Sequence, residues 1–201
     1  LLALWEAAEP HALDPQTLET HGISLLGGVL KKGEAFSAHP RFDPGHHDRP
    51  RMVTFGVSTG PRSTIRLMEF ATDDDPSAGI KAGDLLNDRR DSFNGFAFLH
   101  DFAITPNWAV FLQNAIDFNP LPFVLGRKGA AQCLQSKPDG QAKFWLIPRD
   151  SGAYAGQPPR IVDAPDGFVF HHLNAWEQDG DVVVESIYYS DFPSIGPEVD
   201  F

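Results

Sequence analysis

The stretch Phe96-Ala-Phe-Leu-His-Asp-Phe-Ala-Ile-Thr105 alternates apolar residues along its length and holds one histidine at its centre. Because side chains of a β-strand point to opposite faces in turn, this pattern predicts a strand. His100 would then share a face with four apolar residues, Phe96, Phe98, Phe102 and Ile104. An imidazole among aromatic rings needs a partner for its nitrogen. That partner is either a backbone carbonyl, as for an ordinary core histidine, or a buried metal.

The rest of the chain is typical of short strands joined by turns. Arg51–Ser58 and Ser63–Ala71 predict one hairpin, and Gly167–Glu177 predicts a second with Val182–Tyr189. Helical periodicity is almost absent, which indicates an all-β fold. Consecutive hairpins favour a propeller or a sandwich over a small barrel, and no strict sequence repeat decides between them. The charged stretch Thr72–Ser92 is interpreted as a surface loop.

Composition narrows the class of protein. The chain has 201 residues, of which 42% are hydrophobic and 21% charged, as in ordinary globular domains. Its net charge of −11 argues against a nucleic-acid partner, which would require clustered lysine and arginine. The single cysteine, Cys133, excludes an internal disulfide and a cysteine-based zinc site. No apolar run reaches the roughly 20 residues of a membrane span, and we expect a cytoplasmic protein.

Three histidines lie at apolar strands or strand ends, each in a separate predicted hairpin. His39, His100 and His171 are 61 and 71 residues apart. Propeller blades of roughly 40 to 50 residues would bring residues to one axis at comparable intervals. Ligation by imidazole without thiolate suits Fe(II), Zn, Cu or Ni, and a carboxylate such as Glu6 could bond to a ligand imidazole. The spacing therefore allows a metal centre without establishing one.

Several motifs resemble those of the carotenoid cleavage oxygenases. They occur in the same order along nearly the whole chain, at Leu4–Glu6, Leu13–Thr20, Ala38–Pro44, His100–Thr105 and Phe170–Glu177. The resemblance implies a seven-bladed propeller with a non-haem Fe(II) on its axis, held by four histidines, three of which have glutamate partners. Residues 1–201 would then be an internal fragment with about three of the blades.

The resemblance also assigns roles to individual residues. It implies that His39, His100 and His171 are iron ligands and that Glu6 bonds to His100. In the Phe-His-His run the ligand is the histidine directly after Phe170, so His172 is not chosen. The fourth histidine and two further glutamates would lie beyond Phe201. One departure is Ala7-Ala-Glu9, where relatives tend to have glycines.

The implied reaction is the cleavage of one polyene double bond of an apocarotenoid by O₂, with two aldehydes, one of the retinal type, as products. Alternatives are the cleavage of a stilbene-type bond, the isomerisation of a retinoid ester, and a catalytically silent propeller that binds apolar ligands. Trp5, Phe98 and Phe170 match positions that line the family's substrate tunnel, although core packing explains any single aromatic residue equally well.

An apolar loop is expected at Asn119–Gly126, where two prolines forbid a central strand. We interpret Leu121, Phe123 and Leu125 as a patch that contacts a membrane surface, through which a water-insoluble substrate would enter. The alternative is that the loop docks against another blade.

Overall fold

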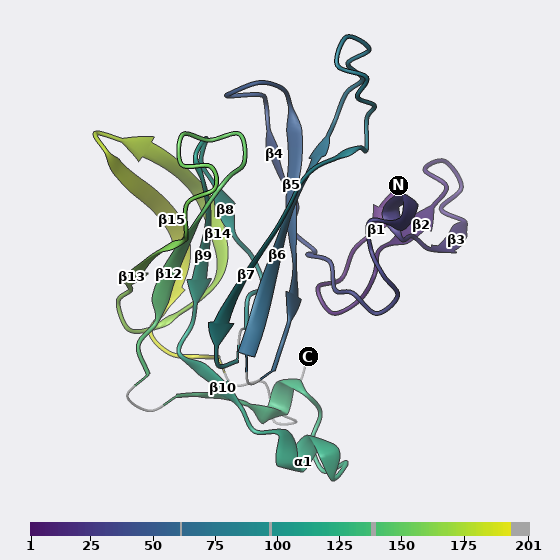
Figure 1. Cartoon of the computed structure of the whole chain (residues 1–201). Helices are drawn as coiled ribbons and strands as arrows, with labels where there is room; N and C mark the ends of the chain where they lie inside the picture. The colour runs from purple at the N-terminus through teal and green to yellow at the C-terminus, as the bar shows by residue number, and fades with distance from the viewer. Residues whose placement is uncertain (61, 97, 138–139, 194–201) are drawn as a thin grey trace.

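The computed structural model describes residues 1–60, 62–96, 98–137 and 140–193, and its fold is all-β, as predicted. Two four-stranded antiparallel sheets form the body of the molecule (Figure 1). The first sheet contains β4 (Arg41–Asp43), β5 (Arg51–Ser58), β6 (Arg62–Ala71) and β7 (Leu85–Asn94), in that order. The second has the order β13-β12-β9-β8, with β8 (Ala103–Ile104), β9 (Trp108–Gln113), β12 (Lys143–Pro148) and β13 (Arg160–Asp163).

Smaller elements are also present among the described residues. A long hairpin consists of β14 (Phe168–Gln178) and β15 (Asp181–Tyr189). An N-terminal sheet contains β1 (Leu2–Ala3), β2 (His11–Leu13) and β3 (Thr20–Ile23). β10 (Ile116–Phe118) pairs with β11 (Leu134–Ser136), and three short helices cover Leu26–Gly28, Pro120–Val124 (α1) and Ala131–Cys133. No helix in the described ranges is long and apolar enough to cross a membrane.

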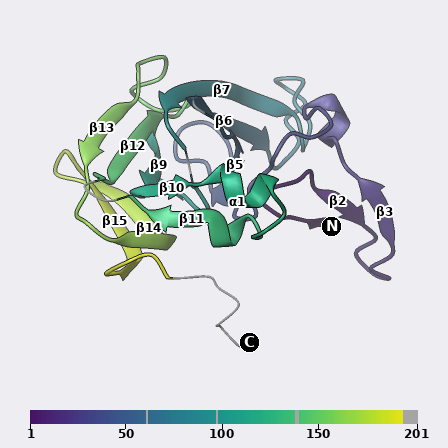
Figure 2. The same ribbon diagram turned by 90° about the horizontal axis from the view of Figure 1, so that it is seen from below.

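The two sheets and the β14–β15 hairpin follow one another around the molecule when it is seen from below (Figure 2). Each sheet has its shortest strand on the inner side, β4 in the first and β8 in the second. β8 contacts both β4 and β14. This succession is that of propeller blades, but the described residues form no closed ring of sheets, so the number of seven blades stays a prediction.

The main core lies between the two four-stranded sheets. Phe55 of β5 meets Phe102 and Phe111 with ring centroids 5.1 and 5.0 Å apart. These three side chains are at most 2% exposed. Burial of such a side chain contributes about 1.5–3 kcal/mol to stability, so this contact fixes the first sheet against the second.

Both predicted hairpins are present. β5 pairs with β6 in the register Ser58↔Thr64, and β14 pairs with β15 up to Gln178↔Asp181. The two residues between those last positions, Asp179 and Gly180, have φ angles of 53° and 89°. A two-residue turn with positive φ at both positions matches the twist of the strands it joins, and Asp-Gly is a preferred sequence for it.

The predicted strand around His100 is wrong in its length. Only Ala103 and Ile104 form a strand, β8, and Ala97 lies outside the described residues. The strict alternation fails as well, because Leu99 and Phe102 belong to the same apolar core although they differ by three positions. Packing between the sheets overrides the two-residue period of the sequence in this segment.

The predicted loop at Thr72–Ser92 is wrong over its second half, which forms most of β7. β7 pairs with β6 and is the edge strand of its sheet. Its charged residues are accommodated there, because the strand alternates between exposed and partly buried positions over most of its length. Asp88, for example, accepts two hydrogen bonds of 2.8 Å from Arg66.

The apolar segment at Asn119–Gly126 contains the short helix α1 rather than an irregular loop. Asn119 caps it, since its side chain accepts a hydrogen bond from Leu121 N. The first proline occupies the first helical position, where a missing N–H costs nothing. α1 lies at the lower end of the molecule in Figure 1.

Candidate metal centre

His39 precedes β4 and is held from two directions. Pro40 restricts it to an extended backbone, and its own N–H donates to Ser37 Oγ at 3.0 Å. Ser37 N in turn donates to Phe55 O of β5 at 2.7 Å. A Cβ at Gly56 would collide with the carbonyl oxygen of Ala35, so the glycine allows this segment to lie close against β5.

His100 lies just before β8, between the buried residues Leu99 and Asp101. Phe102, two positions further, is fully buried in the core between the sheets. Leu99 and Phe102 therefore anchor the segment on both sides of the histidine, and its ring is directed away from that core.

His171 lies in β14, where the pairing with β15 is irregular. The register shifts on both sides of His172, between Val169 and His172 and again between His172 and Asn174. Such bulges re-aim side chains at functional positions. His171 and His172 are consecutive strand residues, so their side chains point to opposite faces.

The three histidines converge. Nε2 of His100 lies 3.0 Å from Nε2 of His39 and 3.2 Å from Nε2 of His171. One nitrogen from each ring falls within 4.8 Å of the others. Residues 61 and 71 positions apart in sequence thus face a common point with the same ring atom.

This geometry fits a metal ion better than it fits hydrogen bonds within the protein. A ring nitrogen has one in-plane lone pair or one hydrogen, whereas Nε2 of His100 faces two other ring nitrogens. Two imidazole nitrogens about 2.1 Å from one metal, at right angles, would be about 3.0 Å apart. The observed spacings are close to this value, so the donor set can hold a metal.

Glu6 lies on the opposite side of the His100 ring. Its Oε2 is 2.5 Å from Nδ1 of His100. A carboxylate at this nitrogen favours the tautomer with hydrogen on Nδ1, which leaves the Nε2 lone pair free for a metal.

His172 is separated from the group of three. It is 5% exposed, and its Nδ1 lies 2.8 Å from Ser186 Oγ. Desolvation by burial lowers the pKa of His172 to about 4, with the nearby Asp101 acting in the opposite direction. The ring is therefore neutral at physiological pH and is engaged with β15.

Burial also lowers the pKa of His39. The charges of the other two histidines and of Arg41 lower this pKa as well, whereas Asp101 raises it. A lowered pKa favours the neutral imidazole, which is the form that binds metals.

Two of the three predicted substrate-contacting aromatic residues lie beside this group. The Phe170 ring is 4.7 Å from that of His100 and 5.8 Å from that of Phe98, edge to face in both cases. Trp5 differs, because its residue is 64% exposed and it takes part in no ring contact within the described parts of the chain.

Two charged residues that the sequence analysis did not single out also lie here. Arg41 and Asp101 form an ion pair of 2.7 Å directly beside the histidine segments. The signal that could have found them was their position, since each follows a candidate ligand by one or two residues within a motif already recognised.

The family described as retinal pigment epithelial membrane protein matches residues 1–200. Apocarotenoid-15,15'-oxygenase of Synechocystis is 43% identical over the whole of this chain. This chain belongs to the carotenoid oxygenase family. Isoeugenol monooxygenase of Pseudomonas putida is 30% identical over 92% of the chain and 35% of its own length.

A solved structure of the Synechocystis apocarotenoid oxygenase, substituted with cobalt, matches all of this chain with a TM-score of 0.87 and 43% identity. The chain covers 40% of that structure and 39% of the Synechocystis oxygenase sequence. It therefore spans about two fifths of the length of these members of the carotenoid oxygenase family.

Proposed function

We propose that the protein containing this chain is an Fe(II)-dependent dioxygenase that cleaves one polyene double bond of an apocarotenoid with O₂, giving two aldehydes, one of the retinal type. The observation that carries the proposal is the convergence of the three Nε2 atoms of His39, His100 and His171. Membership of the carotenoid oxygenase family and 43% identity to an apocarotenoid-15,15'-oxygenase support it.

In this proposal the three histidines hold the iron through Nε2, and a fourth histidine lies outside residues 1–201. Bound iron would supply the electrons that allow O₂ to react with an alkene. Glu6 keeps the hydrogen of His100 on Nδ1 and makes that imidazole a more basic ligand. Two further glutamates would do the same for other histidines, again outside this chain.

The aromatic residues are assigned to the substrate. Phe170 contacts the His100 ring edge to face and Phe98 contacts Phe170 in the same way, and neither ring carries a polar group. We propose that they hold the flat polyene in place and keep water from it, so that position rather than acid–base chemistry determines which bond reacts. Trp5 is proposed as a third such residue, at the exposed margin of the site.

Cleavage of a stilbene-type bond is a second candidate. Resveratrol cleavage oxygenase 1 of Aspergillus fumigatus is 30% identical over 92% of this chain, and isoeugenol monooxygenase is related at a similar level. Their names indicate phenolic substrates. The aromatic wall of Phe98 and Phe170 suits a conjugated chain of either kind.

Product analysis tests the proposal. The full-length protein is incubated with Fe(II), O₂ and, in separate reactions, an apocarotenal, resveratrol and a retinyl ester. Two aldehydes from the apocarotenal are expected. Aldehydes from resveratrol alone would favour the stilbene alternative, and an isomerised retinoid would favour isomerase activity. Unchanged substrates with retained binding would identify a silent ligand-binding protein and contradict the proposal.

We further propose reversible membrane contact through α1. Leu121, Phe123 and Leu125 are 64%, 49% and 53% exposed. Insertion of such side chains contributes about 1.5–3 kcal/mol each, which suits reversible attachment rather than permanent anchoring.

A further inference from the structure

Arg41 and Asp101 join the three segments that carry the histidines. Arg41 is two residues after His39, and Asp101 directly follows His100. Both bond to the backbone of His172, which directly follows His171. One ion pair thus touches all three segments within two residues of each candidate ligand.

Hydrogen bonds connect Arg41, Asp101 and the backbone of His172 in a single network. Arg41 Nη2 donates to both carboxylate oxygens of Asp101, at 2.9 and 2.7 Å, and to His172 O at 2.8 Å. Arg41 Nε donates to Phe102 O at 2.9 Å. The backbone N–H of His172 donates to Asp101 Oδ2 at 2.9 Å. Three chain segments are therefore connected by a planar guanidinium and one carboxylate, whose geometry tolerates little displacement.

These side chains act where strand pairing is weak. β4 has three residues and β8 has two, and β14 is irregular on both sides of His172. Both backbone polar groups of His172 bond to the ion pair. Side-chain hydrogen bonds thus fix the relative positions of segments that short ladders alone would hold poorly.

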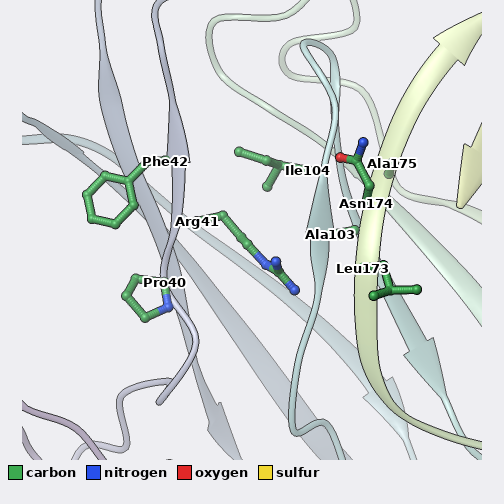
Figure 3. Close-up of a pocket in the computed structure, with 8 residues that line it drawn as sticks. All are labelled: Pro40, Arg41, Phe42, Ala103, Ile104, Leu173, Asn174 and Ala175. Atoms are coloured by element: carbon green, nitrogen blue, oxygen red, sulfur yellow. The ribbon is translucent and has the colours of Figure 1, made fainter. Parts of the chain in front are cut away.

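Three layers follow one another along these segments. The histidines form the first, and Arg41, Asp101 and His172 the second. Beyond them lies a pocket of about 330 Å³ lined by Pro40, Arg41, Phe42, Ala103, Ile104, Leu173, Asn174 and Ala175. Figure 3 shows the Arg41 side chain reaching from β4 toward β8 and β14 across this pocket. The Arg41 side chain, which lines the pocket, is 27% exposed, and that of Asp101 is 2% exposed, so the pair is largely shielded from solvent.

We propose that Arg41 and Asp101 are positioning residues that set the spacing of the three Nε2 atoms, an inference that rests on the proposed metal centre. The pair combines one positive and one negative group, so it fixes positions without adding net charge beside the histidines. Neither side chain points a donor at the common point of the three Nε2 atoms, since their hydrogen bonds are made to each other and to the backbone.

The test compares Asp101→Asn with Asp88→Asn in the full-length protein. Both changes remove the charge of an aspartate whose two carboxylate oxygens accept hydrogen bonds from an arginine, but Asp88 lies on the edge strand β7 and bonds Arg66. The Kd for Co(II), the absorption spectrum of the saturated Co(II) form and the thermal unfolding of the metal-free protein are measured. Asp101→Asn should raise the Kd about 10- to 100-fold, as for other groups that orient ligands, and shift the Co(II) spectrum. Asp88→Asn should leave both unchanged.

Arg41→Lys provides a second variant that keeps the positive charge but loses the fork that bonds Asp101, His172 and Phe102 together. A raised Kd for Co(II) and an altered Co(II) spectrum in this variant, with a thermal unfolding temperature close to that of wild type, would show that the pair positions the ligands rather than only stabilising the fold. If both variants bound Co(II) with the wild-type Kd and spectrum, the inference would be wrong while the metal centre stood. A wild-type protein that bound no Co(II) would overturn the proposed function and this inference with it.

Discussion

The inner strands and the body of the sheets are built in different ways. In the body, β5, β6, β9 and β12 have six to ten residues and pack large apolar side chains between the sheets. At the inner side, β4 and β8 have three and two residues and are joined by an arginine and an aspartate. The body supplies cohesion that depends on burial, whereas the inner side supplies directed contacts that place particular atoms. Substitutions in the body should therefore lower the free energy of unfolding, whereas substitutions at the inner side should weaken metal binding.

The largest effect is expected at the inner side. His100→Ala in the full-length protein should abolish metal binding and cleavage, because its Nε2 lies between those of the other two histidines. The metal-free variant should unfold at nearly the wild-type temperature, since the ring is outside the main core. Metal content and aldehyde formation are the measurements.

His172→Ala is the matched control for that variant. It removes an imidazole of the same kind that bonds Ser186 rather than facing the common point. Appreciable activity is expected. Loss of metal from His172→Ala together with its retention in His171→Ala would show that the assignment is displaced by one residue.

Phe111→Ala should destabilise the fold but leave metal binding by the folded protein intact. The side chain is fully buried between Phe55 and Phe102, so its removal should lower the free energy of unfolding by about 3–5 kcal/mol. The folded fraction should still bind metal with unchanged affinity. Denaturant unfolding and a metal titration check this, and a weakened metal affinity in the folded protein would show that the two regions are coupled.

Glu6→Gln should have a smaller effect at the inner side. The amide oxygen can still face His100 Nδ1 but lacks the carboxylate charge that favours hydrogen on this nitrogen, so activity should fall about 10- to 100-fold. Steady-state kinetics with an apocarotenal measures the loss. Turnover equal to that of wild type would exclude this role for Glu6.

The smallest effect concerns α1, which belongs to neither region. Replacement of Leu121, Phe123 and Leu125 by serine should weaken liposome binding and leave cleavage of detergent-solubilised substrate intact, because these side chains are exposed and distant in the fold from the inner strands. Sedimentation with liposomes measures the binding. Unchanged sedimentation would favour the alternative that α1 docks against another part of the protein.

Local sequence patterns were sufficient to predict several strands and turns. The hairpin turn at Asp179-Gly180 and the paired strands β5 and β6 follow from turn residues and apolar runs that act over a few positions. β7 and α1 were misjudged for the same reason. Charges on an edge strand resemble those of a solvated loop, and a capped helix of one turn has too few residues to show a helical period.

The sequence by itself predicted the all-β class and, through the resemblance of its motifs to those of the carotenoid cleavage oxygenases, three histidines as candidate ligands, the choice of His171 over its neighbour, and Glu6 as a partner of His100. Each of these residues lies in a motif whose residues are contiguous. Tertiary structure alone decided that Nε2 is the ring atom that the three histidines direct to a common point. It also decided that Leu99 and Phe102 pack in one core despite the strand alternation, and that Arg41 bonds both Asp101 and His172. Those bonds join residues 60 and 131 positions apart. Such contacts depend on how the sheets pack against one another, and no local propensity in the chain encodes that packing.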